Sequence, residues 1–467
     1  MNDFDPRHAR PELRRSRGVS YQQLLDQDAR PVPAHLRIDT QADLGDHDIP
    51  IDRYIDSRFH ELEKEKLWPK VWQMAVREER IPEVGDTEIY EINDVSIIIV
   101  RVAPDRIKAF YNACLHMGRI LVDHACKLNE FRCPYHGFTW RTDGKLKHIP
   151  GMWDFPQIKA PEFALPEVKV ATWNGFVFIN MDPDGEPLES YLGEIAGHWD
   201  KYPLDERYTA VHVRKVLRCN WKTAQEAYMD AYHVVATHPQ ILASAGDDNS
   251  QYDVFGNCSR AITAAGVASP HLKWTPSENE IAANVYRPRD AGRATEVPPG
   301  KTYREYGASL VREDLRTLIG DKADELCDAE VMDSFYYTVF PNFHPWLSYN
   351  YVVQNFRPYE DRHDMCVADV MYLRPFVGQR PPPAKITFLN ADQSFLEAPE
   401  MGIAAALQCQ DAFNVEKVQR GLHSLHRSKA GLTLGLYQHT QVRHFHNVYE
   451  RYLGLETPVI GRSQARL

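Results

Sequence analysis

The sequence predicts an α+β protein, with a small β-rich domain followed by a larger domain of antiparallel strands and helices. The first indication is a set of short runs between residues 85 and 182 in which apolar and polar residues alternate. The second is a change after residue 187, where strand-like runs form a group and helical patterns lie before and after it. We divide the chain into an N-terminal arm (1–50), a β-rich domain (51–185) and an α+β domain (186–467).

Composition limits the classes of function. The chain has 467 residues, of which 43% are hydrophobic, and this is enough for a large buried core. Its net charge of −11 argues against a nucleic-acid partner, because phosphate binding needs clustered Lys and Arg. The longest apolar run, near 95–100, is too short to span a membrane, and no secretory signal is evident. We therefore expect a cytoplasmic protein with no membrane partner, and eight scattered cysteines without a disulfide framework.

Local patterns predict the elements of the first two segments. The arm is rich in Pro, Asp and Arg and is expected to be irregular, with a basic, solvated stretch at 7–17. The sequence then predicts a helix at 57–72, strands at 87–92 and 96–102 joined at Asn93–Asp94, and a hairpin over 168–182 that turns at Asn174–Gly175.

The last segment alternates helical and strand-like stretches. Residues 241–305 are rich in Gly, Asp, Asn and Pro, which favours a long surface excursion. The other predicted elements are a helix at 220–238, strands at 334–340, 347–358 and 365–376, and helices in the region after 392.

Four metal-binding side chains form two matched pairs. Cys114 with His116 is the first pair, and Cys133 with His136 is the second. Two Cys and two His can bind tetrahedral zinc, or a [2Fe–2S] cluster with both cysteines on one iron and both histidines on the other. Zinc sites usually pair Cys with Cys and His with His, whereas each pair here holds one of each and the surroundings are strands. This order favours the Rieske type of cluster over zinc.

The ligand types indicate electron transfer. Thiolates hold ferric iron, and neutral imidazoles reduce the negative charge of the cluster, which raises its reduction potential. Histidine ligands also reach the surface and offer a route for electrons. His124 and Cys126 lie between the two pairs but do not fit the spacing. We interpret His124 as a polar loop residue and Cys126 as a packed small side chain.

A second set of metal-binding residues lies at Asp230, His233 and His238. Asp230 and His233 are three residues apart, so on a helix the carboxylate can orient the imidazole. His233 and His238 are five apart, or roughly 140° around a straight helix, so they bind one metal only if the helix ends or bends between them. Two histidines with one carboxylate suit non-heme Fe(II) and leave positions open for O₂. Spacing alone leaves the carboxylate open among Asp392, Glu397, Glu400, Asp411 and Glu416.

With these motifs in order, the chain over about 50–450 resembles the α subunits of Rieske non-heme iron aromatic-ring-hydroxylating oxygenases. "CLHMG" and "CPYHGFTW" are similar to the family's cluster motif, and "NWKTAQEAYMDAYHVVATHP" to its iron-site helix. "QDAFNVEKVQRGL" is similar to the late helix that carries the third iron ligand. The resemblance implies that Asp411 is this ligand and that Asp230 bridges an iron histidine to a cluster histidine of the next subunit. Met117 and Ala227 depart from common family residues, and neither is a ligand.

The resemblance also implies a helix-grip catalytic domain after the Rieske domain, with one [2Fe–2S] cluster and one mononuclear Fe(II) per chain. It implies a homotrimer of α subunits or an α₃β₃ assembly, and NAD(P)H electrons delivered by a separate flavin reductase, with or without a ferredoxin. The chain has no dinucleotide-binding glycine motif of its own. O₂ and a small hydrophobic substrate, aromatic or another ring, are then expected as reactants in aromatic hydrocarbon catabolism.

Four interpretations of the function stay open at this point. Within the family, the reaction is either cis-dihydroxylation or else monooxygenation or O- or N-dealkylation. Outside it, the chain is a Rieske electron carrier without oxygenase activity, or a zinc-stabilised binding protein. For an oxygenase, we expect a pocket lined by residues around Met229, the 241–310 region and the aromatic strands near 335–343, although most of those aromatic side chains are expected in the core.

Overall fold

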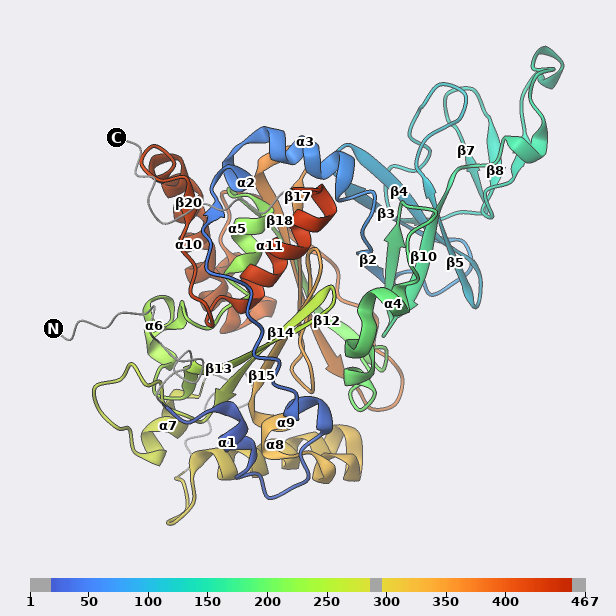
Figure 1. The fold of residues 1–467 in the computed structure, drawn as a ribbon. Helices are drawn as coiled ribbons and strands as arrows, with labels where there is room; N and C mark the ends of the chain where they lie inside the picture. Colours follow the sequence, from blue (N-terminus) through green and yellow to red (C-terminus); the bar gives the residue numbers. More distant parts are fainter. Residues whose placement is uncertain (1–17, 286–295, 456–467) are drawn as a thin grey trace.

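Two sheets, of seven and eight strands, organise the chain, and helices cover the larger one (Figure 1). The computed structural model describes residues 18–285 and 296–455. Helices and antiparallel sheets are both abundant, so the predicted α+β class is confirmed. Among the described residues, no helix combines the length and the apolar run that crossing a membrane requires. The basic stretch at 7–17 lies outside the described residues.

The first sheet is antiparallel and forms the body of the β-rich region, drawn in blue and teal in Figure 1. Both predicted turns are confirmed, with Asn93 and Asn174 in the left-handed conformation that tight hairpins require. In spatial order the strands are β2 (Gln73–Arg77), β11 (Phe176–Asn180), β10 (Glu167–Trp173), β5 (Arg106–Tyr111), β4 (Val95–Ala103), β3 (Asp86–Ile92) and β6 (Cys126–Lys127).

A small three-stranded sheet extends this region outward. Its apolar core includes Phe131, Phe138 and Trp140, which pack with Phe110 of the larger sheet. The strands are β7 (Glu130–Arg132), β8 (Thr139–Arg141) and β9 (Leu146–His148). The two cysteine–histidine pairs lie in the loops between β5 and β6 and between β7 and β8.

The second sheet lies in the C-terminal region and meets the first through aromatic packing. Phe176 and Phe178 of β11 contact the ring of Phe343 at 4.9 and 5.4 Å. The strands, in spatial order, are β13 (Ala245–Phe255), β14 (Cys258–Ala265), β15 (Ser334–Val339), β16 (Phe343–Pro345), β17 (Val352–Tyr359), β18 (Arg362–Pro375), β12 (Arg207–Leu217) and β19 (Thr387–Leu389). Only β12 and β19 are paired in parallel among the described strands.

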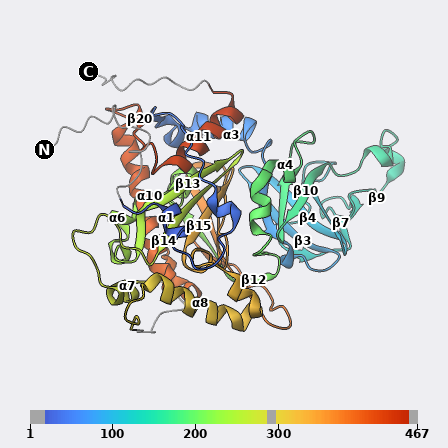
Figure 2. The ribbon, with the colours of Figure 1, turned by 60° about the horizontal axis from the view of Figure 1, so that its bottom comes forward.

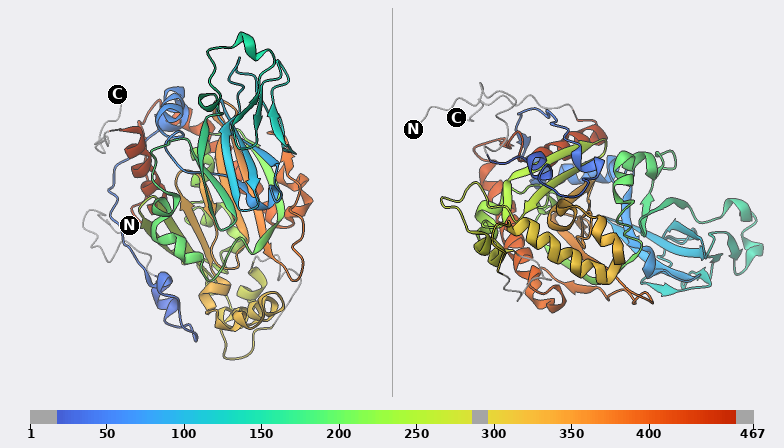
Figure 3. Two further views of the ribbon diagram at one scale, coloured as in Figure 1. Left: turned by 90° about the vertical axis from the view of Figure 1, so that its right-hand side faces the viewer. Right: turned by 90° about the horizontal axis from the view of Figure 1, so that it is seen from below.

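Helices pack on one face of this sheet and across one of its ends. The predicted late helices are confirmed as α10 (Ala404–Leu425) and α11 (Thr440–Leu453). Together with α5 (Trp221–Glu226), α11 contacts one face of the sheet, and the yellow helix α8 (Tyr303–Ile319) crosses the opposite end (Figure 3). The remaining α-helices in the described chain are α1 (Tyr21–Leu25), α2 (Asp52–Ile55), α3 (Ser57–Lys66), α4 (Leu188–Leu192), α6 (Val234–Thr237), α7 (Glu278–Asn284) and α9 (Asp328–Met332), while β1 (Ile49–Pro50) pairs with β20 (Gly431–Leu432).

The expectation of a long surface excursion over 241–305 is wrong for its first part. Residues 245–265 form the β13–β14 hairpin of the second sheet, and most of their side chains are buried. The hairpin was hard to predict because β13 is rich in Asp, Asn and Gln. Some of its polar groups are paired internally, for example in the buried ion pair between Arg260 and Asp253. Residues 286–295 of this stretch lie outside the described residues.

The described part of the N-terminal arm packs on the C-terminal region. The backbone N–H of Thr40 donates to Asp253 at 2.9 Å, and the Tyr21 hydroxyl donates to Asp333 at 2.9 Å. Helices α2 and α3 also pack there, against α10 and α11, although the sequence analysis assigns 51–72 to the β-rich domain. Apart from α1, a short 3₁₀ helix and β1, the described part of the arm is irregular, as expected, and it contributes Tyr21, Leu24 and Leu25 to the large core.

Candidate functional site

The two cysteine–histidine loops are copies of one turn. In the first, the N–H of Gly118 donates to the carbonyl of Cys114 at 2.8 Å; in the second, the N–H of Gly137 donates to the carbonyl of Cys133 at 2.9 Å. Both glycines have φ of +76°, which a residue with a Cβ adopts only under strain. The N–H groups of both cysteines donate to the residue five positions later at 2.8 Å. Equivalent turns thus present equivalent thiols.

The four side chains converge at the outer end of the β-rich region. The rings of His116 and His136 are 4.7 Å apart, and His116 stacks on Phe138 at 4.6 Å. Cys114 and Cys133 are almost fully buried, whereas His136 is exposed. Burial raises the pKa of the Cys114 thiol, and the hydrogen bond to Cys133 adds to the shift. Buried thiols beneath outward imidazoles form a donor set that fits a Rieske [2Fe–2S] cluster.

The intervening residues lie apart from this group. Cys126 is in β6, paired with Thr87, and packs against the apolar core of the small sheet. His124 is an exposed loop residue. The interpretation of Cys126 as a packed side chain and of His124 as a polar loop residue is therefore confirmed.

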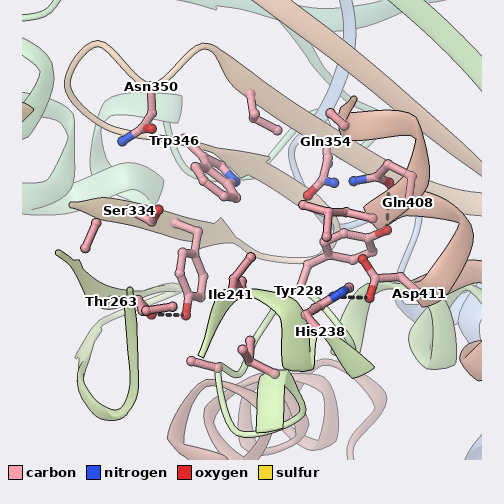
Figure 4. A pocket seen from close by; sticks show the side chains of 18 of the residues that line it. Tyr228, His238, Ile241, Thr263, Ser334, Trp346, Asn350, Gln354, Gln408 and Asp411 are labelled. Atoms are coloured by element: carbon pink, nitrogen blue, oxygen red, sulfur yellow. Dashed lines mark hydrogen bonds and ion pairs between the residues drawn. The ribbon is translucent and has the colours of Figure 1, made fainter. Parts of the chain in front are cut away.

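A second donor set forms where α6 meets α10. His233, His238 and Asp411 bring one ligand atom each to within 4.8 Å of one another. The Oδ1 atom of Asp411 is 2.9 Å from Nε2 of His238, a contact drawn as a dashed line in Figure 4. The same Oδ1 atom is 3.8 Å from Nε2 of His233. Two imidazoles and one carboxylate on one side of a common centre are a donor set that fits non-heme Fe(II).

The predicted helix over 220–238 is wrong in its middle. Helix α5 ends at Glu226, residues 227–233 form turns, and α6 is only four residues long. The carboxylate of Asp230 accepts the backbone N–H of His233 at 2.9 Å, as such side chains do in turns that compete with helix. This break brings His233 and His238 together although they are five residues apart. It meets the condition that the spacing imposed.

The same turn places Asp230 against the imidazole of His233. Its Oδ1 atom is 3.3 Å from Nδ1, on the ring edge opposite to the Nε2 atom that faces Asp411. Burial by itself lowers the pKa of His233, but the hydrogen bond and charge of Asp230 outweigh it and raise the pKa. Asp230 therefore sets the orientation and tautomer of this imidazole.

One partner of the triad was missed by the sequence analysis. Gln410 places Oε1 at 2.8 Å from Nδ1 of His238, and the same oxygen accepts from Gln240 at 2.9 Å. A carbonyl at Nδ1 fixes the proton there and leaves Nε2 free to bind a metal. In the sequence, Gln410 is marked only by its position directly before Asp411. This position does not predict a contact with His238 unless the three-dimensional structure is known.

The structure separates the five carboxylates that spacing left open. Asp411 alone among them reaches the histidines. Glu416 accepts from the backbone of Arg218, Asp392 pairs with the Arg218 side chain, Glu397 accepts from the backbone of Ser394, and Glu400 binds the hydroxyl of Thr387. The other four are thus engaged elsewhere.

A cavity of about 310 Å³ opens onto the triad. Tyr336, Trp346 and Tyr372 form much of its wall, and Ile241 and Thr263 line it from the region after α6 (Figure 4). Met229 is in the core, and its neighbour Tyr228 lines the cavity instead, donating to Gln408 at 2.8 Å. Phe335 and Phe343 are core residues, as expected. The cavity wall is largely apolar, and its polar groups include the triad, as in a small-molecule site.

The two donor sets lie at opposite ends of the folded protein. The loops around β7 and β8 project from the outer end of the β-rich region, whereas α6 and α10 lie on the far side of the second sheet (Figures 1 and 2). Next to the cluster loops, the surface exposes Met117, Tyr135 and Trp153, the last at 85%. Exposed apolar side chains that gather in this way are typical of protein-contact surfaces.

The family model described as "Ring hydroxylating alpha subunit (catalytic domain)" matches residues 198–455, and that of the Rieske [2Fe-2S] domain matches 71–162. Over 192 residues, 39% of this chain, the sequence is 32% identical to the chlorobenzene dioxygenase subunit alpha of Cupriavidus sp. PS12. Over 217 residues, 45% of this chain, it is 30% identical to the carnitine monooxygenase oxygenase subunit of Escherichia coli K12. The matches span 42% and 57% of the length of these relatives.

Solved structures share the fold at low sequence identity. Naphthalene 1,2-dioxygenase from Rhodococcus sp. bound to indole superposes with a TM-score of 0.60 at 19% identity, covering 88% of this chain and 95% of that one. A quaternary ammonium Rieske monooxygenase in complex with an inhibitor gives 0.62 at 20% identity, covering 87% and 95%. The arrangement of both regions is thus that of known Rieske oxygenases.

Proposed function

The chain belongs to the family of Rieske ring-hydroxylating oxygenase alpha subunits, and from this we propose its function. We propose that it is the terminal oxygenase component of a multicomponent system that hydroxylates an aromatic or other hydrophobic ring. The observation that carries this assignment is the triad of His233, His238 and Asp411, whose ligand atoms face a largely apolar cavity. An electron carrier has no need of such a cavity.

Each donor set is assigned to one metal centre. Cys114, His116, Cys133 and His136 would hold the [2Fe–2S] cluster, and His233, His238 and Asp411 the mononuclear iron. The iron supplies activation of O₂, with electrons that the cluster stores. Asp230 would bind Nδ1 of His233 and Gln410 would bind Nδ1 of His238, so that both Nε2 atoms stay unprotonated and oriented. Substrate would lie against the aromatic wall, where it excludes water from the triad.

We also propose that electrons cross between chains. The donor sets of one chain lie at opposite ends, so a head-to-tail homotrimer, or an α₃β₃ assembly, would bring the cluster of one chain to the Asp230 side of the next. The exposed Met117, Tyr135 and Trp153 support contact at the cluster end, and Tyr232, 46% exposed, supports it beside the triad. A separate flavin reductase, with or without a ferredoxin, would deliver NAD(P)H electrons in the cytoplasm.

The proposal includes two outcomes of the reaction. Dihydroxylation fits the dioxygenase relative, with a role in aromatic catabolism, and monooxygenation fits the carnitine monooxygenase relative. Incubation with ¹⁸O₂, a surrogate reductase and a panel of ring substrates, followed by mass spectrometry, tests both. Label from O₂ in the product supports an oxygenase, with one or two atoms per product separating the outcomes. O₂ consumed without labelled product for any substrate, at full iron content, would refute the assignment.

A further inference from the structure

One polar side chain in the wall of the cavity has no partner. Gln354 lies on β17, in the middle of the second sheet, and is 1% exposed. Neither its Oε1 nor its Nε2 has a hydrogen-bond partner in the protein. Buried amides are almost always paired, because an unpaired buried donor or acceptor costs the free energy of its lost hydration. A cavity-lining amide that the fold leaves unpaired is therefore available to a ligand.

The position of Gln354 relates it to the reacting end of the cavity. It lines the same cavity as the triad, and Figure 4 shows its amide on the side of Gln408, Tyr228 and Asp411. The hydroxyl of Tyr228 donates a hydrogen bond to Oε1 of Gln408 at 2.8 Å. Whichever way the Gln354 amide is turned about its last bond, it offers one donor and one acceptor to this space.

The rest of the wall indicates what else the ligand is. Tyr336, Trp346 and Tyr372 present ring surfaces, which suit a flat apolar body. Among the lining residues in the described part of the chain there is no Lys or Arg to neutralise a carboxylate. The polar group that meets Gln354 is therefore best matched by an uncharged one.

We propose that Gln354 is a specificity-determining residue, whose amide hydrogen-bonds an uncharged hydroxyl or carboxamide group on the ring substrate. The inference rests on the proposed function, because it concerns the substrate of that same site. A substrate group placed against the Gln354 amide supplies the hydrogen bonds that the fold leaves unmade. A bare hydrocarbon leaves the amide unpaired, and a quaternary ammonium group has no N–H or lone pair with which to bond it. Both are disfavoured relative to a ring with a hydroxyl or carboxamide.

Matched ligands test this without turnover. The iron- and cluster-loaded protein is titrated calorimetrically, without O₂, with phenol and benzene, with 2-naphthol and naphthalene, with benzamide, and with trimethylphenylammonium. We expect the hydroxylated or amide-bearing member to bind about tenfold or more tightly than its parent ring. The substitution Gln354→Met keeps the size of the side chain but removes its hydrogen bonds, so this ratio is expected to fall to about one.

A matched control separates specificity from folding. Gln441→Met changes another fully buried glutamine with an unpaired oxygen, one that does not line the cavity, and it is expected to keep the wild-type ratio. An unchanged ratio in Gln354→Met, or tighter binding of trimethylphenylammonium or of the parent rings than of their polar counterparts by the wild type, would overturn the inference. The proposed function is judged separately, from iron content and labelled product, so the failure of one is distinguishable from that of the other.

Discussion

Asp230 and His233 are joined twice, through the backbone N–H of His233 at 2.9 Å and through its Nδ1 atom at 3.3 Å. The first bond shapes the turn that interrupts the helix, and the second orients the imidazole toward Asp411. The same carboxylate thus builds the site and lies on the path that we propose for electrons.

In protein loaded with excess iron, so that both metal centres are filled, Asp230→Ala is expected to slow the transfer of electrons from the reduced cluster to the iron. The physical reason is the loss of the only carboxylate bonded to Nδ1 of His233 among the described residues. Single-turnover absorbance of the cluster should show that the rate of its reoxidation decreases about 10- to 100-fold. Asp392→Ala, which removes an exposed acid paired with Arg218, is the control and should be near normal. Normal transfer in Asp230→Ala, with iron and cluster intact, is incompatible with the proposed path.

Gln410→Leu is expected to weaken iron binding at the triad by about 10- to 100-fold, since the bond to Nδ1 of His238 is lost. Chelator competition measures this affinity, and the absorbance of the cluster should not change. Gln240→Leu removes the exposed partner of the same Gln410 oxygen and should have little effect. Equal iron affinity in Gln410→Leu and wild type would show that His238 does not need this bond.

Glu226 is expected to make stability fall as pH rises. Burial raises the pKa of this carboxyl to about 8 from an ordinary 4.5, against the lowering effect of its hydrogen bond from Tyr54. Between these two values the folded protein holds a proton that the unfolded chain has lost, so the free energy of unfolding decreases with rising pH. Burial also lowers the pKa of the neighbouring His446, 2.9 Å away, so that imidazole stays neutral over the range.

Glu226→Gln tests this directly, because glutamine does not titrate. Denaturant unfolding between pH 4.5 and about 8 should show a shallower decline for the variant than for the wild type. Parallel curves for the two proteins would mean that Glu226 titrates normally in the folded state.

Gly137→Ala is expected to reduce stability and cluster content. At φ of +76° an alanine costs about 1–2 kcal/mol, and its Cβ would lie 3.2 Å from Cγ of Pro150. Visible absorbance measures the cluster and thermal unfolding measures stability. Gly421→Ala, on the exposed face of α10 with open space around it, should be neutral or stabilising by about 1 kcal/mol. Wild-type cluster content in Gly137→Ala would contradict the role given to the matched turns.

Trp153→Ser is expected to weaken association of the chains, since this side chain is 85% exposed beside the cluster loops. Analytical ultracentrifugation over a concentration series should show dissociation at higher concentration than for wild type. Trp274→Ser, at a tryptophan that is 52% exposed elsewhere, is the control. An unchanged trimer in Trp153→Ser would place the contact surface elsewhere, and a monomeric wild-type protein would contradict the proposed assembly.

The sequence predicted local elements where one chemical signal dominates. Hairpin turns at Asn93 and Asn174 follow from residues that tolerate positive φ, and α10 and α11 follow from their apolar period. The β13–β14 hairpin was missed because its polar side chains are buried by partners far away in the sequence, such as Thr40 on Asp253. Periodicity does not report such partners.

The site was predictable to a similar degree. The spacing of Cys114, His116, Cys133 and His136 indicated one donor set, and the spacing of His233 and His238 required a broken helix, which the structure has. The break itself depends on a turn closed by Asp230, where a helix is the expected alternative. Gln410 and Gln354 could not be identified, because their roles depend on which buried atoms the tertiary fold leaves facing them.

The most direct test of the central claim is the iron content of the purified protein, measured together with electron paramagnetic resonance of the reduced cluster. The account predicts about three irons per chain with a Rieske signal, and about two irons with the same signal in Asp411→Ala. About two irons in the wild type, unchanged in Asp411→Ala, would make the chain an electron carrier. Zinc without a signal would contradict both proposed metal centres.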